Sequence, residues 1–125
     1  MSREFYICRE CGTIVGAMEP IKAELVCNGH PMERLEAGAV DASKEKHVPA
    51  VTVNGNRVEV QVGSVLHPSI PAHYIPWVYL ETEKGGQRKA IKPGEEPKAV
   101  FELVDDKPLR VYAYCNLHGL WVADI

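Results

Sequence analysis

The sequence has no apolar run that approaches the length of a membrane span. Its first residues, MSREFYICRECG, carry charge and two cysteines where a secretory signal peptide has an uninterrupted apolar stretch. Basic residues are not in excess either, since 14 lysines and arginines stand beside 17 acidic residues, for a formal charge of −3. We therefore expect a cytoplasmic protein with no membrane partner. A nucleic acid is not an expected partner, because phosphate binding depends on clustered Lys and Arg.

Cysteine is scarce, and its four copies do not indicate a disulfide framework. A chain that is not secreted and contains Cys-x-x-Cys is better explained by metal binding or redox chemistry, so we expect reduced thiols. The remaining composition, with 46% hydrophobic and 25% charged residues, is ordinary for a globular protein. A length of 125 residues suits one medium domain, or a small domain with an appendix.

Composition divides the chain near residue 38. The first 36 residues hold three of the four cysteines, in CRECG and LVCNGHPM, with glycines at turn positions beside them. This segment looks like a metal-binding knuckle with little core of its own. We predict two domains, at residues 1–37 and 38–125.

The later segment is predicted to be all-β. The stretch VTVNGNRVEVQVGSV alternates in character around Asn54-Gly55, a strong hairpin signal. YIPWVYLET is a further strand, turned by Lys84-Gly85-Gly86 into QRKAI, and AVFELV, LRVYAYC and GLWVADI follow. Six or seven short strands without a convincing amphipathic helix predict an antiparallel sandwich.

Histidines concentrate in this β segment. Four of the five fall there, each expected at a strand end or in a loop, where loops of a sandwich can converge on one site. A single loop histidine is usually solvated, and a lone strand cysteine is usually a small buried hydrophobe. Their coincidence favours a five-ligand metal site. Its members are His47, His67, His73, Cys115 and His118.

The number of ligands narrows the choice of metal. Structural zinc is saturated by four tetrahedral ligands. Blue copper uses a weak axial methionine, but Met1, Met18 and Met32 all precede the β segment. Iron accepts five protein ligands with one position open, which implies a small molecule that binds there and exchanges an electron.

Three motifs resemble a known family. AGAVDASKEKHVP, HPSIPAHYIPW and YCNLHGLW are similar to the iron-binding motifs of desulfoferrodoxins, which are superoxide reductases, and CRECG with Cys27 resembles that family's desulforedoxin-type knuckle. The resemblance implies an immunoglobulin-like β-sandwich with a ferrous centre, and a desulforedoxin-like domain at residues 1–37. It implies four equatorial histidines, His47, His67, His73 and His118, with Cys115 as the axial thiolate.

The resemblance also implies an activity. Superoxide would be reduced to hydrogen peroxide without release of dioxygen, and a donor such as rubredoxin would resupply the electron. Glu45 and Lys46, just before the first histidine, would serve the open position: Lys46 would steer the anion and Glu45 would cap ferric iron. If the iron-binding motifs were absent, Glu45 and Lys46 would be interpreted as ordinary solvent-exposed charges. Packing of the N-terminal segment against a second copy makes a homodimer an expectation.

The chain departs from the family pattern at one point. The full knuckle has four cysteines, the last two adjacent, whereas Cys27 is followed here by Asn28. The site could be empty, which we predict. It could instead hold zinc or iron through three cysteines and a histidine, or two of its thiols could form a disulfide in air. The residues of this second candidate site are Cys8, Cys11, Cys27 and His30.

Two other functions are compatible with the same residues. A metal-binding sandwich could simply carry electrons or store metal, but it would gain nothing from an open position beside a lysine. A superoxide dismutase would also need iron and an anion-steering lysine. Demand for an external reductant distinguishes a reductase from a dismutase.

Overall fold

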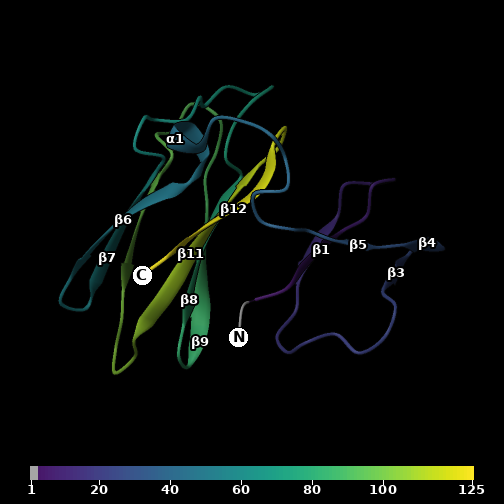
Figure 1. The fold of residues 1–125 in the computed structure, drawn as a ribbon, viewed down its shortest axis with the longest axis horizontal. Helices are drawn as coiled ribbons and strands as arrows, with labels where there is room; N and C mark the ends of the chain where they lie inside the picture. The colour runs from purple at the N-terminus through teal and green to yellow at the C-terminus, as the bar shows by residue number, and fades with distance from the viewer. Residues whose placement is uncertain (1–2) are drawn as a thin grey trace. The chain divides into compact units, whose positions relative to one another are not determined.

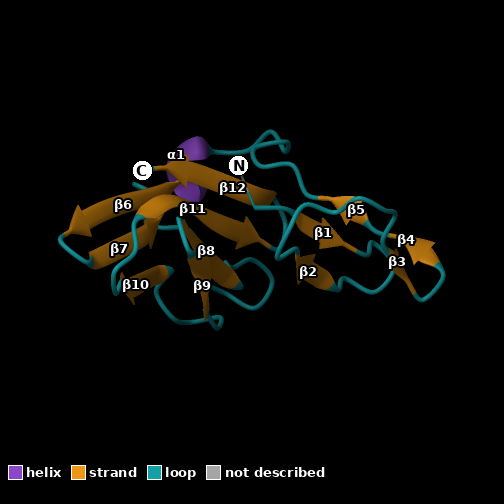
Figure 2. Ribbon diagram, turned by 90° about the horizontal axis from the view of Figure 1, so that it is seen from below, coloured by secondary structure: helices purple, strands orange, loops and turns teal. Residues whose placement is uncertain are grey.

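The structure is a computed structural model that describes residues 3–125. Strands dominate, and the described residues contain one short helix (Figure 2). The chain forms two compact units, Met1–Glu36 and Ala37–Ile125. No helix among the described residues is long and apolar enough to cross a membrane.

The smaller unit contains two small sheets. Three strands pair antiparallel in the order β2-β1-β5, and β3 with β4 forms a separate hairpin. Their bounds are β1 (Phe5–Ile7), β2 (Ile14–Gly16), β3 (Val26–Cys27), β4 (His30–Pro31) and β5 (Glu33–Arg34). Asn28 and Gly29 both have positive φ, as the two-residue turn between β3 and β4 requires. The buried hydrophobic residues of this unit are few, namely Phe5, Ile7, Cys8 and Leu35.

The larger unit is an all-β antiparallel sandwich, as the sequence predicts. One sheet has the strand order β10-β7-β6 and the other β12-β11-β8-β9 (Figure 2). The elements are α1 (Lys44–His47), β6 (Pro49–Asn54), β7 (Arg57–Val62), β8 (Trp77–Thr82), β9 (Gly85–Ala90), β10 (Lys98–Glu102), β11 (Pro108–Cys115) and β12 (Gly119–Asp124).

Both predicted hairpins exist, but their turns are displaced. Asn54 pairs with Arg57, so the first turn is Gly55-Asn56 rather than Asn54-Gly55. Thr82 pairs with Gly85, which places the second turn at residues 83–84 and both glycines in β9. Gly86 is needed in the strand because a Cβ there would overlap the hydroxyl of Tyr79. This glycine therefore reflects close packing and not a turn.

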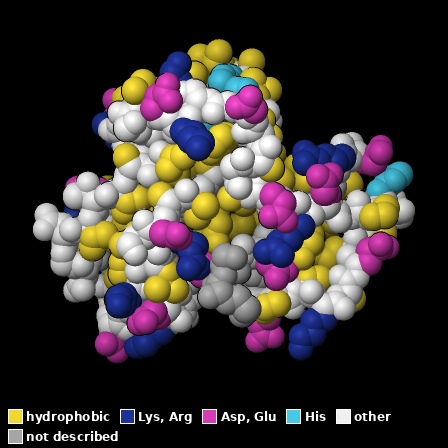
Figure 3. Space-filling view, in the orientation of Figure 1, with side chains coloured by type: hydrophobic (Ala, Val, Ile, Leu, Met, Phe, Trp, Pro, Cys, Tyr) yellow, Lys and Arg dark blue, Asp and Glu magenta, His cyan; other side chains and the backbone are white. Residues whose placement is uncertain are grey.

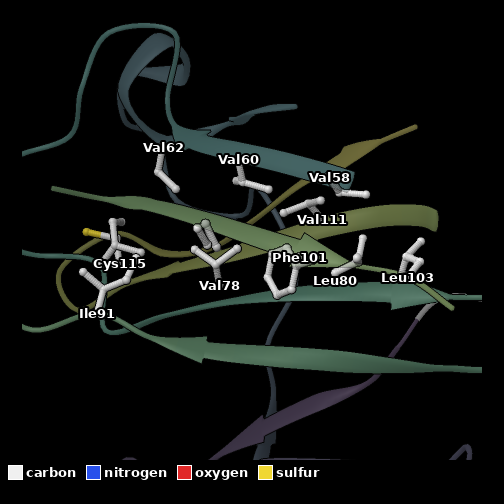
Figure 4. Close-up of a cluster of buried hydrophobic side chains, with 13 residues drawn as sticks. Val58, Val60, Val62, Val78, Leu80, Ile91, Phe101, Leu103, Val111 and Cys115 are labelled. Carbon is white, nitrogen blue, oxygen red and sulfur yellow. The ribbon is translucent and has the colours of Figure 1, made fainter. Parts of the chain in front are cut away.

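The two sheets share one hydrophobic core. Alternation in β7 directs Val58, Val60 and Val62 inward, where they meet residues of β8, β10 and β11. Figure 4 shows Cys115 at one end of this row of side chains, with its sulfur pointing away from them. The rigid core thus ends at the residue that the sequence predicts as the axial ligand.

Candidate metal centre

The five predicted ligands converge at one end of the sandwich. His47 ends α1, His67 follows β7, His73 precedes β8, Cys115 ends β11 and His118 lies in the turn before β12 (Figure 1). The sequence predicts a strand end or a loop for His47. It is the last residue of a one-turn helix at residues 44–47, two residues before β6 begins. That turn buries His47 while its neighbours Lys44, Glu45 and Lys46 remain exposed.

The four imidazole rings lie at the corners of a near-square. Neighbouring ring centroids are 4.7 Å (His47 and His67), 4.5 Å (His67 and His73), 5.1 Å (His73 and His118) and 4.9 Å (His118 and His47) apart. The diagonal from His47 to His73 is 6.4 Å. Each neighbouring pair meets nearly edge to face, at 74° to 86°. Such a square is the arrangement of four equatorial ligands.

Backbone carbonyls orient two of these rings. Nδ1 of His47 lies 2.6 Å from the carbonyl oxygen of Ser43, and Nδ1 of His67 lies 2.7 Å from that of Pro68. The carbonyl can only accept a hydrogen bond, so Nδ1 carries the proton and Nε2 is left with the lone pair. Nε2 of His67 and Nε2 of His73 are buried and have no hydrogen-bond partner in the described structure. Unsatisfied buried nitrogens are costly, so this orientation fits metal binding.

The Cys115 thiol completes the cluster. Its side chain is fully buried, and its sulfur lies within 4.8 Å of ring nitrogens of His47, His67 and His73, all of which lie within that distance of one another. His118 joins through Nδ1, which is 3.1 Å from Nε2 of His47 and 3.9 Å from the Cys115 sulfur. The backbone N–H of His118 also donates to that sulfur, at 3.4 Å. Three histidines and the thiol thus form one group, and His118 lies at its edge, within 3.9 Å of two of its members.

Burial sets the protonation of these groups. It lowers the pKa of His47 and His73, and it lowers the pKa of His67 to about 4, so these imidazoles are neutral near pH 7. Burial raises the pKa of Cys115, so the metal-free protein holds a protonated thiol there. A metal ion that binds must displace this proton. Neutral imidazoles with one thiolate are a donor set that fits a non-haem iron centre.

Glu45 and Lys46 lie on the exposed face of α1. The pKa of Glu45 is lowered, chiefly by a hydrogen bond from its own backbone N–H, so this carboxylate is ionised near neutral pH. Burial is the main cause that lowers the pKa of His47 and His73, and the neighbouring histidines lower it further. The positive charge of Lys46 also lowers the pKa of both residues. The field of Lys46 therefore reaches the cluster.

Two residues that the sequence did not single out support the cluster. The Trp121 ring stacks on His47 at a centroid distance of 4.9 Å, and its indole N–H donates to the carbonyl of His118 at 3.1 Å. Asn116 accepts a hydrogen bond from the N–H of Tyr74 and donates to the carbonyl of Ala72, on either side of His73. Their place in YCNLHGLW is the signal that could have found them.

The smaller unit brings three of its predicted ligands together. The sulfurs of Cys8, Cys11 and Cys27 lie within 4.8 Å of one another. His30 pairs with Cys27 across the β3–β4 hairpin, but it does not belong to this group. Hydrogen bonds, first from Thr13, lower the pKa of Cys11 to about 7, and the hydrogen bond with Cys11 raises the pKa of Cys27 to about 11.

The family model for desulfoferrodoxin matches residues 39–124, which include the whole cluster of four histidines and one cysteine. The chain belongs to the desulfoferrodoxin family. A desulfoferrodoxin homolog from Archaeoglobus fulgidus is 45% identical over 118 residues, which cover 94% of each chain. The match therefore spans both units of this desulfoferrodoxin.

Solved structures agree with this assignment. The superoxide reductase from Treponema pallidum has 38% sequence identity and a TM-score of 0.84, with 98% of each chain covered. A superoxide reductase from Giardia intestinalis, described as a one-iron enzyme, has 38% identity and a TM-score of 0.57, and covers 66% of this desulfoferrodoxin and 98% of itself. The immunoglobulin-like sandwich predicted from the motifs is thus confirmed.

Proposed function

We propose that this protein is a superoxide reductase whose iron is held by His47, His67, His73, Cys115 and His118. One observation carries the proposal: four imidazole rings form a square beside a single buried thiol. His47, His67, His73 and Cys115 make up the metal-binding group among the described residues, and His118 adjoins it through Nδ1. A six-coordinate iron would keep one position for a small molecule. The relatives named superoxide reductase support superoxide as that molecule.

When bound at these residues, ferrous iron would supply the one electron that the reduction of superoxide requires. The chain would hold and tune this metal, whereas the protons and the replacement electron would come from outside the chain. The buried histidines stay neutral and hold the metal, and the thiolate of Cys115 donates electron density, tuned by the N–H of His118 at 3.4 Å from its sulfur. Superoxide, one electron and two protons give hydrogen peroxide, and water is the proton source. No dioxygen is formed.

Lys46 and Glu45 serve the approach of substrate and the exit of product. The chain carries a net charge of −3, which repels an anion, and the exposed ammonium of Lys46 offsets this locally over a screening length of about 8 Å. The ionised carboxylate of Glu45 would cap the metal, in its ferric form, at the position that the five residues leave open. The one-turn helix presents both beside His47.

A rubredoxin-like protein resupplies the electron in this proposal. Exposed hydrophobic side chains beside the ligands support a docking surface for it, and Figure 3 shows hydrophobic side chains gathered around a histidine at this end of the sandwich. The exposed hydrophobic residues beside the ligands in the sequence are Val65, Leu66, Ile70 and Leu117. Apolar contact there would bring a redox partner close to the centre and exclude water from the path.

The test combines a spectrum with an assay of products. The purified protein, oxidised mildly, is expected to show a red-region thiolate-to-ferric band that ascorbate bleaches, and Cys115→Ser should remove this band. Under a steady flux of superoxide with an added reductant, we expect peroxide without dioxygen beyond spontaneous dismutation. Activity that persists without a reductant would indicate a dismutase. Bound iron that azide and cyanide never perturb would indicate an electron carrier or a metal store.

A further inference from the structure

The proposed function leaves the three cysteines of the smaller unit without a role. Their sulfurs lie within 4.8 Å of one another, and those of Cys11 and Cys27 are 3.6 Å apart. Exposure separates them, since Cys11 is exposed, Cys27 is half-buried and Cys8 is 1% exposed. The accessible thiol of Cys11 is therefore in contact with that of Cys27, and the buried thiol of Cys8 lies within 4.8 Å of both.

Local structure holds these thiols near one another. The loop from Cys8 to Thr13 is closed by two backbone hydrogen bonds, from Gly12 N–H to the Cys8 carbonyl and from Cys8 N–H to the Thr13 carbonyl. Cys27 ends β3 at the Asn28-Gly29 turn. Both Cys11 and Cys27 thus sit where a loop or turn can adjust. A fourth metal ligand does not join the group among the described residues, whereas tetrahedral thiolate sites use four.

We propose that Cys11 and Cys27 form a reversible disulfide when hydrogen peroxide oxidises them, so that the protein records its own product. This inference rests on the proposed function, because superoxide reduction supplies the peroxide. Accessible thiols placed beside a second, resolving thiol are the sites that peroxide oxidises selectively. Cys8 is buried and stays reduced.

The step balances without any further oxidant. The sulfur of Cys11 attacks one oxygen of peroxide, the O–O bond breaks, and Cys11 becomes a sulfenic acid while one water leaves. The sulfur of Cys27 then displaces the hydroxyl from Cys11, the S–S bond forms, and a second water leaves. The two thiols lose two electrons in total, and peroxide gains two. A bond of about 2.05 Å requires the sulfurs to approach from their 3.6 Å separation.

Contacts assign the two roles. The sulfur of Cys11 is exposed and shares a hydrogen bond with the Thr13 hydroxyl at 3.1 Å, so it is the atom that peroxide reaches first. Cys27 is less accessible but lies in contact with it. Reduction of the disulfide by a small dithiol restores both thiols and completes the cycle.

The test adds peroxide directly to the reduced full-length protein and counts thiols. One equivalent should remove two of the four thiols, lower the mass by two hydrogen atoms, and yield a peptide that links Cys11 to Cys27. Cys11→Ser should abolish the link. Cys27→Ser should stop at a sulfenic acid on Cys11 that dimedone traps. Both variants keep the iron ligands, so oxidation that depends only on iron appears equally in all three proteins.

Three results would overturn the proposal. All four thiols could remain after peroxide treatment, the linked peptide could contain Cys8, or the purified protein could carry stoichiometric zinc or iron on these sulfurs. A second arm replaces added peroxide with superoxide and a reductant, and compares wild type with His118→Ala. If added peroxide forms the Cys11–Cys27 link but superoxide with a reductant does not, the proposed function is contradicted and the proposed disulfide is supported. If superoxide is consumed but neither superoxide nor added peroxide forms the link, only the proposed disulfide is contradicted.

Discussion

At the scale of single residues, the centre depends on which atom of each side chain faces inward. His47 and His67 each commit one ring nitrogen to a backbone carbonyl, at 2.6 and 2.7 Å, which fixes the other as the free donor. Cys115 directs its sulfur away from the core side chains (Figure 4). Ring nitrogens of His47, His67 and His73 lie within 4.8 Å of this sulfur. Residue types were readable from the sequence, but these atom-level choices depend on the backbone around each ring.

Replacing Lys46 by alanine should slow superoxide capture. Loss of one positive charge beside the centre removes local attraction in a chain of net charge −3, and we expect the second-order rate to fall by a factor of roughly 3 to 10. The rate is measured against ionic strength, and its salt dependence should weaken as well. Lys107→Ala is the matched control. It removes the same charge at the residue just before β11, roughly 25 Å along the strand from Cys115.

The buried histidines should make the metal-free protein sensitive to acid. Burial lowers the pKa of His67 to about 4 from an ordinary value of 6.5, so the unfolded chain binds a proton at mildly acidic pH that the folded chain does not. Stability present above pH 6.5 is therefore lost as the pH falls toward 4. Urea unfolding of the metal-free protein across this range measures the loss. His67→Gln should flatten the pH dependence.

At the scale of elements, the site depends on hydrogen bonds between loops that are distant in the sequence. Asn116 contacts the segment around His73 through three hydrogen bonds: its backbone N–H and its Oδ1 bond to Tyr74, and its Nδ2 donates to the carbonyl of Ala72. Two ligand-bearing segments are thereby fixed to each other. Sequence patterns placed the strands well because alternation is local, but they could not reveal which loops are joined.

Asn116→Ala should loosen the centre while leaving the sandwich folded. Each lost hydrogen bond costs about 1 kcal/mol, so stability should fall by roughly 2 kcal/mol, and iron should dissociate faster because His73 is less restrained. Iron release to a chelator and the position of the thiolate-to-ferric band are the measurements. Leu117→Ala, on the adjacent exposed residue, is the control. Equal effects of the two changes would contradict a specific role for the Asn116 amide.

At the scale of the whole molecule, the two units differ in how many buried hydrophobic residues and proposed ligands they contain. Residues 37–125 contain the shared core and all five proposed iron ligands, whereas the smaller unit has few buried hydrophobic residues. The Giardia intestinalis superoxide reductase matches only 66% of this chain. The activity is therefore expected to belong to the larger unit alone.

Removing residues 1–36 should leave a folded protein that binds iron. We expect the same thiolate-to-ferric band and a superoxide capture rate within about twofold of the full chain, because none of the proposed ligands is lost. The full-length protein purified in parallel is the control. A truncated protein that folds and yet cannot hold iron would contradict the independence of the larger unit.

The sequence by itself indicated the β class and the existence of two hairpins, because the alternation of side chains along a strand is a local pattern. It also predicted a set of five metal ligands, because these residues stand in short motifs. Tertiary structure alone decided the square arrangement of the imidazoles, the helical turn at His47, and the supporting contacts of Trp121 and Asn116. It also brought Cys11 to Cys27. These features depend on where the chain folds back on itself, and contacts between residues distant in the chain leave no periodic signal in it.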